Sequence, residues 1–190
     1  AQNQGNSRSI RKIHLLERQW AEKMNDISLS QDLIPLADGF IAKKRDEMCR
    51  ELTAKYLLST DEALEIVSTF LEDSYGPAMA LAEEIAKREG PVMLFIGRND
   101  CTICQRCRPV LERFIVEHRE LQSVILDYSQ PEGLLYHLIH WVDNGMLPLI
   151  AFISKGKIMM KTCGECAAEQ VYEKCYRDIK DECRQNLYVH

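Results

Sequence analysis

The chain has 190 residues, of which 46% are apolar and 28% charged, as is ordinary for a globular protein. Its net charge of −5 disfavours nucleic acid, which selects for basic surfaces. No apolar run approaches the ~20 residues that span a bilayer, and the polar N-terminus lacks the apolar core of a signal peptide. We therefore expect neither a nucleic-acid partner nor a membrane partner. Eight cysteines without a secretory signal favour the reducing cytoplasm, where cysteines serve redox or metal chemistry.

The first part of the chain is predicted to be all-helical. Its apolar periodicity predicts four helices, at about residues 9–24, 38–57, 60–74 and 77–87. The stretch "STDE", residues 59–62, matches a capping box at the start of the third helix. The stretch "YGP", residues 75–77, is expected to separate the third helix from the fourth. We interpret residues 1–88 as a helical N-terminal extension or small domain.

Residues 51–71 have the rhythm of a helix–turn–helix reader of DNA. The second of these helices, however, begins with Asp61, Glu62 and Glu65, which would repel phosphate. We therefore disfavour DNA binding. The N-terminal helices are instead predicted to dock a partner or to form an oligomer.

The pattern changes at residue 89, where short apolar runs begin to alternate with helical segments. Strands are predicted at residues 92–96, 123–128, 148–154 and 158–162. Helices are predicted from the cysteine loop to about residue 120, at residues 131–142, and at about residues 167–187. Residues 155–157, "KGK", form a tight turn between the last two strands. The order βαβαββα predicts an α/β domain over residues 89–190.

The stretch "RNDCTICQRCRPV", residues 98–110, places a Cys-x-x-Cys at the first strand-to-helix junction. Pro109 lies eight residues after Cys101, and Pro148 opens the third strand. With the element order, these features resemble the thioredoxin/glutaredoxin superfamily over roughly residues 90–187. The resemblance implies a thioredoxin-like sandwich in which Pro148 is a cis-proline that positions the backbone of a protein disulfide substrate or redox partner protein.

The first cysteine pair is suited to redox chemistry for a physical reason. A cysteine at a helix start lies beside unpaired backbone N–H groups and the positive end of the helix dipole, which stabilise the thiolate. Arg98 and Arg106 are expected to add to this stabilisation and Asp100 to oppose it. Our leading hypothesis is thiol–disulfide exchange, in which Cys101 attacks a substrate disulfide and Cys104 resolves the mixed disulfide.

The other six cysteines divide into packing positions and a second pair. Cys49, Cys107, Cys175 and Cys183 align with apolar residues at helical spacing and are predicted to be buried. Cys163 and Cys166, in "CGEC", follow the last strand, where the topology is expected to bring Cys163 near Cys101.

The sequence leaves two alternative roles open for Cys163 and Cys166. It also leaves open a further alternative for the function of the whole protein. Cys163 and Cys166 are a second dithiol, relay or recognition element, or they join Cys101 and Cys104 as ligands of an iron–sulfur cluster or zinc, for electron transfer or cluster handling. In the third reading the protein is a non-catalytic thioredoxin-like subunit of a larger assembly.

Three other polar residues are also considered as site residues. His137 and His140 share one helix face and are predicted to be an interfacial or surface pair rather than metal ligands. Asp127 ends the second strand of the predicted domain, where it either supports the active site or is solvated.

Overall fold

The computed structural model describes residues 31–141, 145–166 and 169–185, and side chains up to residue 181. Residues 31–190 make up one compact unit, separate from residues 1–30. The helix predicted at residues 9–24 therefore lies outside the described residues. Among the described helices, none combines the length and apolar character that a membrane crossing requires.

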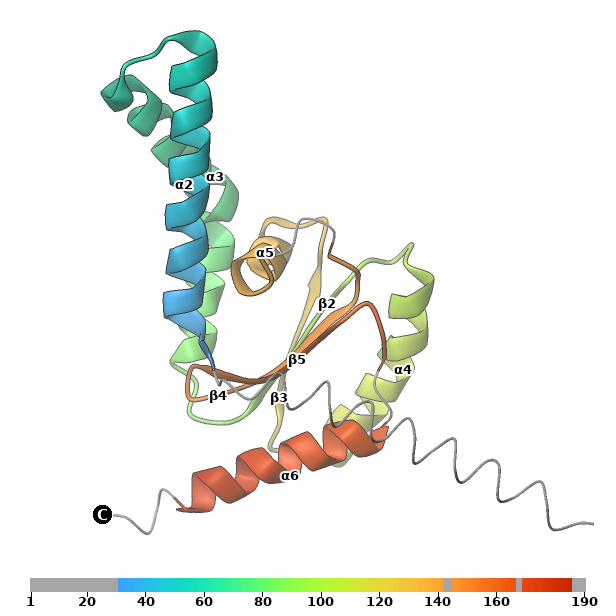
Figure 1. Ribbon diagram of the computed structural model, residues 1–190. Coiled ribbons are helices and arrows are strands. Elements are labelled where there is room, and N and C mark those ends of the chain that lie inside the picture. Colours follow the sequence, from blue (N-terminus) through green and yellow to red (C-terminus); the bar gives the residue numbers. More distant parts are fainter. Residues whose placement is uncertain (1–30, 142–144, 167–168, 186–190) are drawn as a thin grey trace, which may run out of the picture. The chain divides into compact units, whose positions relative to one another are not determined.

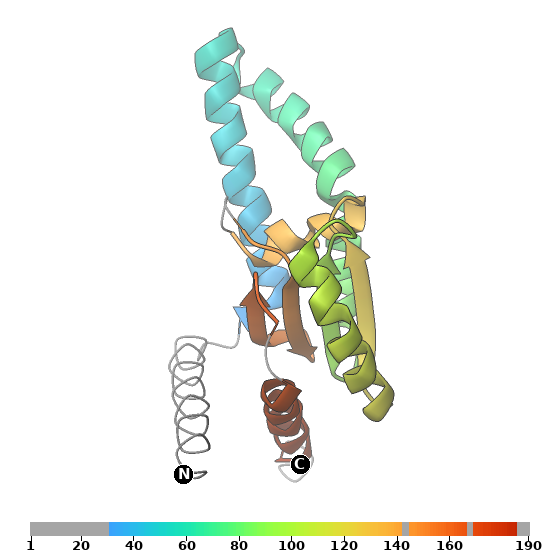
Figure 2. The same ribbon diagram turned by 90° about the vertical axis from the view of Figure 1, so that its right-hand side faces the viewer.

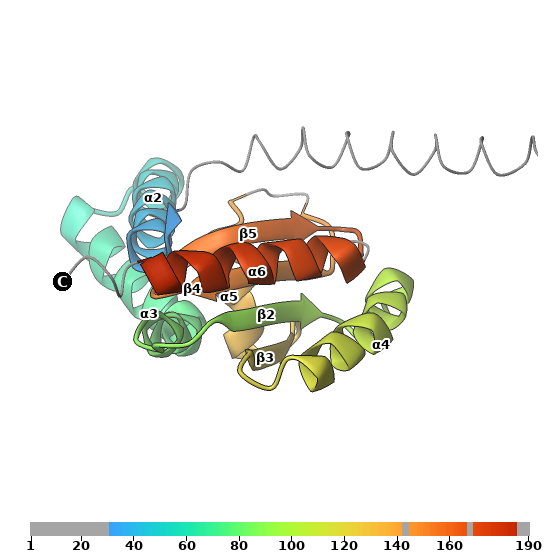
Figure 3. The ribbon, with the colours of Figure 1, turned by 90° about the horizontal axis from the view of Figure 1, so that it is seen from below.

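A single five-stranded sheet, in the order β1-β5-β4-β2-β3, forms the centre of this unit. Strands β2 and β3 run parallel, whereas β4 is antiparallel to β2 and β5, and β1 is antiparallel to β5. Figure 3 shows the four longer strands side by side. The strands comprise β1 Gln31–Asp32, β2 Val92–Gly97, β3 Gln122–Asp127, β4 Leu149–Ser154 and β5 Lys157–Cys163.

The helices lie on both sides of the sheet (Figure 1). Helices α2 and α3 form a hairpin that extends past the strands (Figure 2), and α2 packs against α5. The element order predicted from residue 89 onward is confirmed, with a short 3-10 turn ahead of α5. The helical segments are α2 Leu33–Tyr56, α3 Thr60–Ala86, α4 Thr102–Glu117, η1 Pro131–Leu134, α5 Leu135–Ile139 and α6 Glu169–Gln185.

Alternation along the strands divides the core into two layers, one on each face of the sheet. Leu94 of β2 and Leu149 of β4 belong to the cluster formed with α2, α3 and α5. Phe152 of β4 packs on the other face, with its ring 6.1 Å from the rings of Phe114 in α4 and Tyr172 in α6. All six residues of β2 and all six of β4 are buried, as expected for strands covered on both faces.

The predicted capping box is confirmed at the start of α3. The Ser59 hydroxyl accepts a hydrogen bond from the Glu62 N–H at 3.3 Å, and the Glu62 carboxylate accepts one from the Ser59 N–H at 2.9 Å. The predicted break at residues 75–77 is wrong, because α3 continues through Pro77. The turns after Pro77 bury Ala82 and Ile85 in the core, and this packing outweighs the lost backbone hydrogen bond, about 3 kcal/mol.

Strand β1 was not predicted, because two exposed polar residues carry no periodic signal. It pairs with the start of β5, and the Leu33 N–H donates to the Gly156 carbonyl at 2.8 Å. Leu33 and Ala37 are fully buried, so α2 starts at the sheet edge and shares its core. The domain boundary near residue 88 stays a prediction.

Candidate redox site

Cys101 is the N-cap of α4, immediately beyond the loop that follows β2. Its Sγ accepts a hydrogen bond from the Cys104 N–H at 3.2 Å, and its carbonyl accepts one from the Gln105 N–H at 3.0 Å. The first turn of α4 contains no acidic residue. The positive end of the helix therefore faces the first sulfur, as the sequence predicted.

Cys101 and Cys104 are joined as a disulfide, with their Cα atoms 5.2 Å apart. Cys104 is buried, with only 3% of its surface exposed, whereas Cys101 is partly exposed. The two residues therefore differ in access: Cys101 is partly open to solvent, whereas Cys104 is covered by the fold.

The segment that opens β4 lies directly against Cys101. The Leu147–Pro148 peptide bond is cis, as the resemblance implied, and Pro148 is buried. The Cys101 Sγ lies 3.8 Å from the Leu147 carbonyl oxygen. A backbone polar group thus borders the exposed sulfur, although the proposed role of Pro148 in positioning a substrate stays a prediction.

The charged side chains around Cys101 and Cys104 are not arranged as we expected from the sequence. Arg98 forms an ion pair with Asp100, so its charge is partly neutralised in the loop before Cys101. Arg106 is exposed, while Arg108 lines a small cavity of about 40 Å³ beside Cys104. Sequence reasoning missed Arg108, although its position one turn after Cys104 on α4 could have revealed it.

Cys163 lies at the cis-proline end of the sheet, at the last position of β5. It pairs with Leu149, and the next residue, Gly164, donates its N–H to the Pro148 carbonyl at 2.9 Å. Burial raises the pKa of the Cys163 thiol to about 11, although the nearby Lys161 ammonium and Tyr136 hydroxyl oppose this effect. At neutral pH Cys163 is therefore a protonated thiol.

Cys166 occupies different surroundings, three residues further along the chain. Its Sγ lies 3.8 Å from the Tyr172 hydroxyl of α6. Burial, followed by a hydrogen bond with the Cys166 thiol, raises the pKa of the Cys107 thiol in α4 well above its ordinary value. Cys107 is fully buried, as predicted from its helical spacing, but its hydrogen bond with Cys166 was not foreseen. Cys175 is also buried, as predicted, and Cys49 is half-buried.

The four cysteines predicted as possible metal ligands have different surroundings in the structure. Within the described residues, no group of three or more His, Cys, Asp or Glu side chains is arranged to hold a metal ion. Cys101 and Cys104 are bonded to each other, Cys163 packs against the layer formed with α5, and Cys166 lies beside the Tyr172 hydroxyl. The metal centre at Cys101, Cys104, Cys163 and Cys166 therefore stays a prediction.

The remaining polar candidates have structural partners. The His137 ring accepts or donates a hydrogen bond with the Tyr128 hydroxyl at 2.7 Å, and burial lowers the pKa of His140. Asp127 accepts two hydrogen bonds from Ser129, at 2.8 Å from its N–H and 2.6 Å from its hydroxyl, which lower the pKa of the Asp127 carboxyl. These groups stabilise the loop after β3 and the packing of α5.

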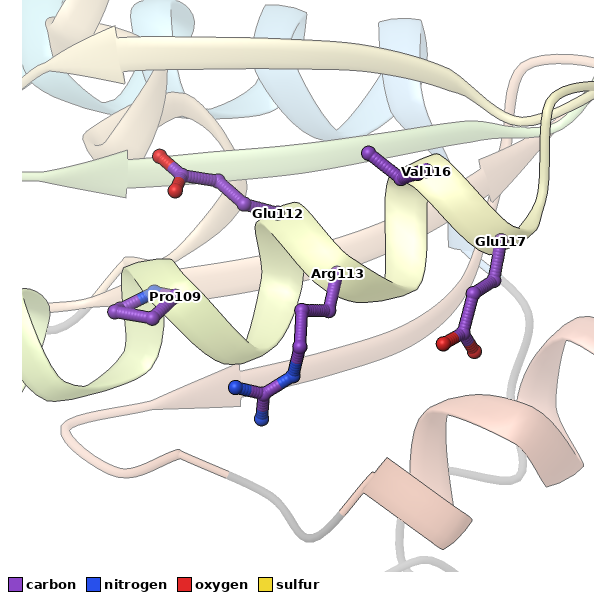
Figure 4. Close-up of a pocket in the computed structure, with 5 residues that line it drawn as sticks. All are labelled: Pro109, Glu112, Arg113, Val116 and Glu117. Carbon is purple, nitrogen blue, oxygen red and sulfur yellow. The ribbon is translucent and has the colours of Figure 1, made fainter.

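A shallow hollow on α4 is not a second candidate site. The described residues that line it all come from α4, as Figure 4 shows, and include neither a thiol nor a histidine. They are Pro109, Glu112, Arg113, Val116 and Glu117.

No protein-family model and no curated protein sequence matches the chain. Solved thioredoxin structures do match. Mitochondrial thioredoxin 3 from Saccharomyces cerevisiae, in its oxidised form, is 16% identical, with a TM-score of 0.42, over 52% of this chain and 87% of its own. A structure from work on the thiol-resolving mechanism of the yeast mitochondrial 1-Cys peroxiredoxin has the same identity, TM-score and coverage. Thioredoxin from Fasciola hepatica is 18% identical, with a TM-score of 0.41, over 52% of this chain and 88% of its own.

The topology itself identifies the fold. A parallel β2–α4–β3 unit is followed by the antiparallel pair β4–β5, with the cysteine pair at the start of α4 and a cis-proline at the start of β4. Helices cover both faces of the sheet. The described part of the chain therefore has a thioredoxin-like α/β fold.

Proposed function

We propose that this protein performs thiol–disulfide exchange with protein substrates through Cys101 and Cys104. The observation that carries the proposal is the bonded pair at the N-terminus of α4, with one partly exposed sulfur and one buried sulfur. Exchange requires an accessible thiolate that attacks and a second thiol within reach that resolves the mixed disulfide. The two cysteines meet both requirements.

In the reduced protein, the Cys101 thiolate attacks one sulfur of the substrate disulfide and releases the other as a thiolate. The Cys104 thiolate then attacks the Cys101 Sγ, and the second substrate thiolate leaves. The two protons lost by Cys101 and Cys104 end on the substrate thiols, so the substrate is reduced as the pair is oxidised. The Cys104 N–H, which donates to the Cys101 Sγ, supports the thiolate needed for the first step.

The surface next to the pair supports a polypeptide as the substrate. Ile103, between the two cysteines, is 38% exposed, and Met146, before Leu147, is 61% exposed. Apolar side chains at these positions would contact the side chains of an extended segment while the Leu147 carbonyl borders the sulfur. The partner is therefore a protein disulfide or a redox protein.

The test is a disulfide reduction assay with insulin, in which the reduced chains precipitate. Cys101→Ser should abolish catalysis, because it removes the attacking sulfur. Cys104→Ser should also stop turnover but should accumulate a mixed disulfide at Cys101. Cys49→Ser, which alters a half-buried cysteine in α2, is the control and should retain activity. Full activity of the Cys101→Ser variant would exclude the proposed mechanism.

The other readings of the sequence stay predictions. They comprise the metal centre at Cys101, Cys104, Cys163 and Cys166, the non-catalytic subunit, oligomerisation through the N-terminal helices and location in the cytoplasm. None of them is needed for exchange through Cys101 and Cys104.

A further inference from the structure

The small cavity beside Cys104 has walls of apolar, amide and arginine side chains. Its volume of about 40 Å³ is enough for a water molecule. The lining residues are Phe95, Arg98, Asn99, Cys104, Gln105 and Arg108. In the described part of the chain, therefore, no carboxylate lines the cavity and none stands there to take the proton of Cys104 as a base.

Strand β2 covers Cys104 with an apolar wall. A Cβ added at Gly97 would lie 2.7 Å from the ring of Phe95 and 3.3 Å from the Cβ of Cys104. The lack of a side chain at Gly97 thus lets the ring and the cysteine approach each other closely. Neither β2 nor β4 carries a charged residue. Such surroundings disfavour a charged thiolate, which is the form that resolves a mixed disulfide.

Arg108 brings a fixed positive charge to the same cavity. It lies one turn after Cys104 on α4, a spacing that places two Cβ atoms about 5–6 Å apart. Both residues line the cavity, so the guanidinium and the thiol share one small space. A guanidinium does not lose its proton in a protein. Arg108 therefore cannot act as a base, but its charge favours a thiolate beside it.

The other charged groups around the cavity are engaged elsewhere. Arg98 forms an ion pair with Asp100 in the loop before α4. Asp127, at the end of β3, is kept ionised mainly by hydrogen bonds from Ser129, and the charges of Arg98 and Arg108 lower its pKa further. Among the described residues Arg108 forms no ion pair, so Asp127 offsets its charge only from a distance.

We propose that Arg108 stabilises the Cys104 thiolate and thereby speeds the second step of exchange, an inference that rests on the proposed function. In that step the Cys104 thiolate attacks the Cys101 Sγ, and the Cys101–Cys104 bond forms as the bond from Cys101 to the substrate sulfur breaks. The substrate leaves as a thiolate and takes up the proton that Cys104 gave to water. Arg108 acts through Cys104 and is therefore a positioning residue.

A rapid-quench experiment isolates this step. Reduced protein is mixed with the disulfide of thionitrobenzoate, quenched with acid at successive times, alkylated and cut with trypsin. Peptide 99–106 holds both Cys101 and Cys104. Its mass distinguishes the dithiol, the adduct with one thionitrobenzoate and the internal disulfide. Formation of the adduct measures attack by Cys101, and its conversion to the internal disulfide measures attack by Cys104.

Arg108→Met should raise the pH midpoint of the conversion by about one unit, as expected for the loss of a neighbouring opposite charge. Below the midpoint the thiolate fraction falls about tenfold, while each thiolate becomes about threefold more nucleophilic. Conversion should therefore be about threefold slower at pH 7 and about threefold faster well above the midpoint, so that the two pH profiles cross. A structural defect would instead slow conversion at every pH.

Two matched variants complete the test. Arg108→Lys keeps the positive charge and should retain most of the wild-type rate at pH 7. Arg113→Met removes an exposed arginine further along α4 (Figure 4) and should follow the wild-type profile. If Arg108→Met matches Arg113→Met at every pH, or is slower by one constant factor, the role of Arg108 is excluded while exchange stands. A wild-type adduct that never converts would exclude the proposed function as well.

Discussion

We predict that Cys163, although it lies at the same end of the sheet as the redox site, reacts slowly as a nucleophile. Burial raises the pKa of its thiol from an ordinary value of 9.0 to about 11, even though Lys161 and Tyr136 act in the opposite direction. Only the thiolate reacts with an alkylating agent. Two pH units correspond to about a 100-fold smaller thiolate fraction at pH 7.5 than in the unfolded chain.

The measurement compares one residue in two states of the same protein. Reduced protein is pulsed with iodoacetamide at pH 7.5, once folded and once in denaturant, and labelling of Cys163 is followed in tryptic peptide 162–174. We expect labelling to be at least about 100-fold slower in the folded protein, because partial burial also limits access. The rate should increase about tenfold per pH unit up to about pH 11.

A variant at Lys161 tests the cause of the shift. The Lys161 ammonium, which donates to the Ile139 carbonyl at 2.8 Å, lowers the pKa of Cys163. Lys161→Met should therefore slow labelling of Cys163 further, whereas Lys161→Arg keeps the charge and should change it less. If the labelling rate of Cys163 in the folded protein is within about tenfold of its rate in denaturant, burial does not suppress its thiolate. Cys163 would then be a candidate nucleophile again.

Three further outcomes follow from the packing and the loops. Phe114→Ala should lower the free energy of unfolding by about 3–5 kcal/mol in urea titrations, because Phe114 is fully buried among aromatic rings of α6 and β4; an unchanged midpoint would contradict that packing. Gly133→Ala should cost about 1–3 kcal/mol, because a Cβ would lie 2.2 Å from the Asp127 carbonyl oxygen. The hydrogen bonds from Ser129 lower the pKa of Asp127 below 3.8, so its carboxylate stabilises the fold above pH 3.8 and that contribution is lost as the pH falls through the lower folded-state value. The difference in unfolding free energy between wild type and Asp127→Asn should therefore disappear in acid, and a difference that grows in acid would contradict the sign.

Local signals in the sequence were sufficient for most of the fold. The run at residues 92–96 became a strand buried on both faces, and the capping box at residues 59–62 fixed the start of α3. Pro77 disfavours a continuous helix locally, but the buried residues after it hold α3 together through tertiary packing. Strand β1 forms by backbone pairing with β5, and the two polar residues of β1 carry no pattern that predicts this pairing.

The candidate site could be predicted only where the chemistry lies within one short segment. Cys101 and Cys104 share a helix turn, so their spacing carried the prediction. The position of Cys166 beside the Tyr172 hydroxyl of α6 depends on where the chain turns after β5. Cys163 and Cys166 are neighbours in the motif, yet the end of β5 separates their environments. Tertiary placement of this kind leaves no spacing pattern in the sequence.

The central claim is that Cys101 and Cys104 interconvert between dithiol and disulfide, and a redox titration tests it most directly. The folded protein is equilibrated anaerobically in glutathione buffers of graded ratio, quenched and alkylated, and tryptic peptide 99–106 reports both sulfurs together. We predict a single two-electron transition in which both cysteines change state at the same ratio, in wild type and in Cys163→Ser protein alike. Cysteines that stay unoxidised at every ratio, or that change state only when Cys163 is present, would contradict the account.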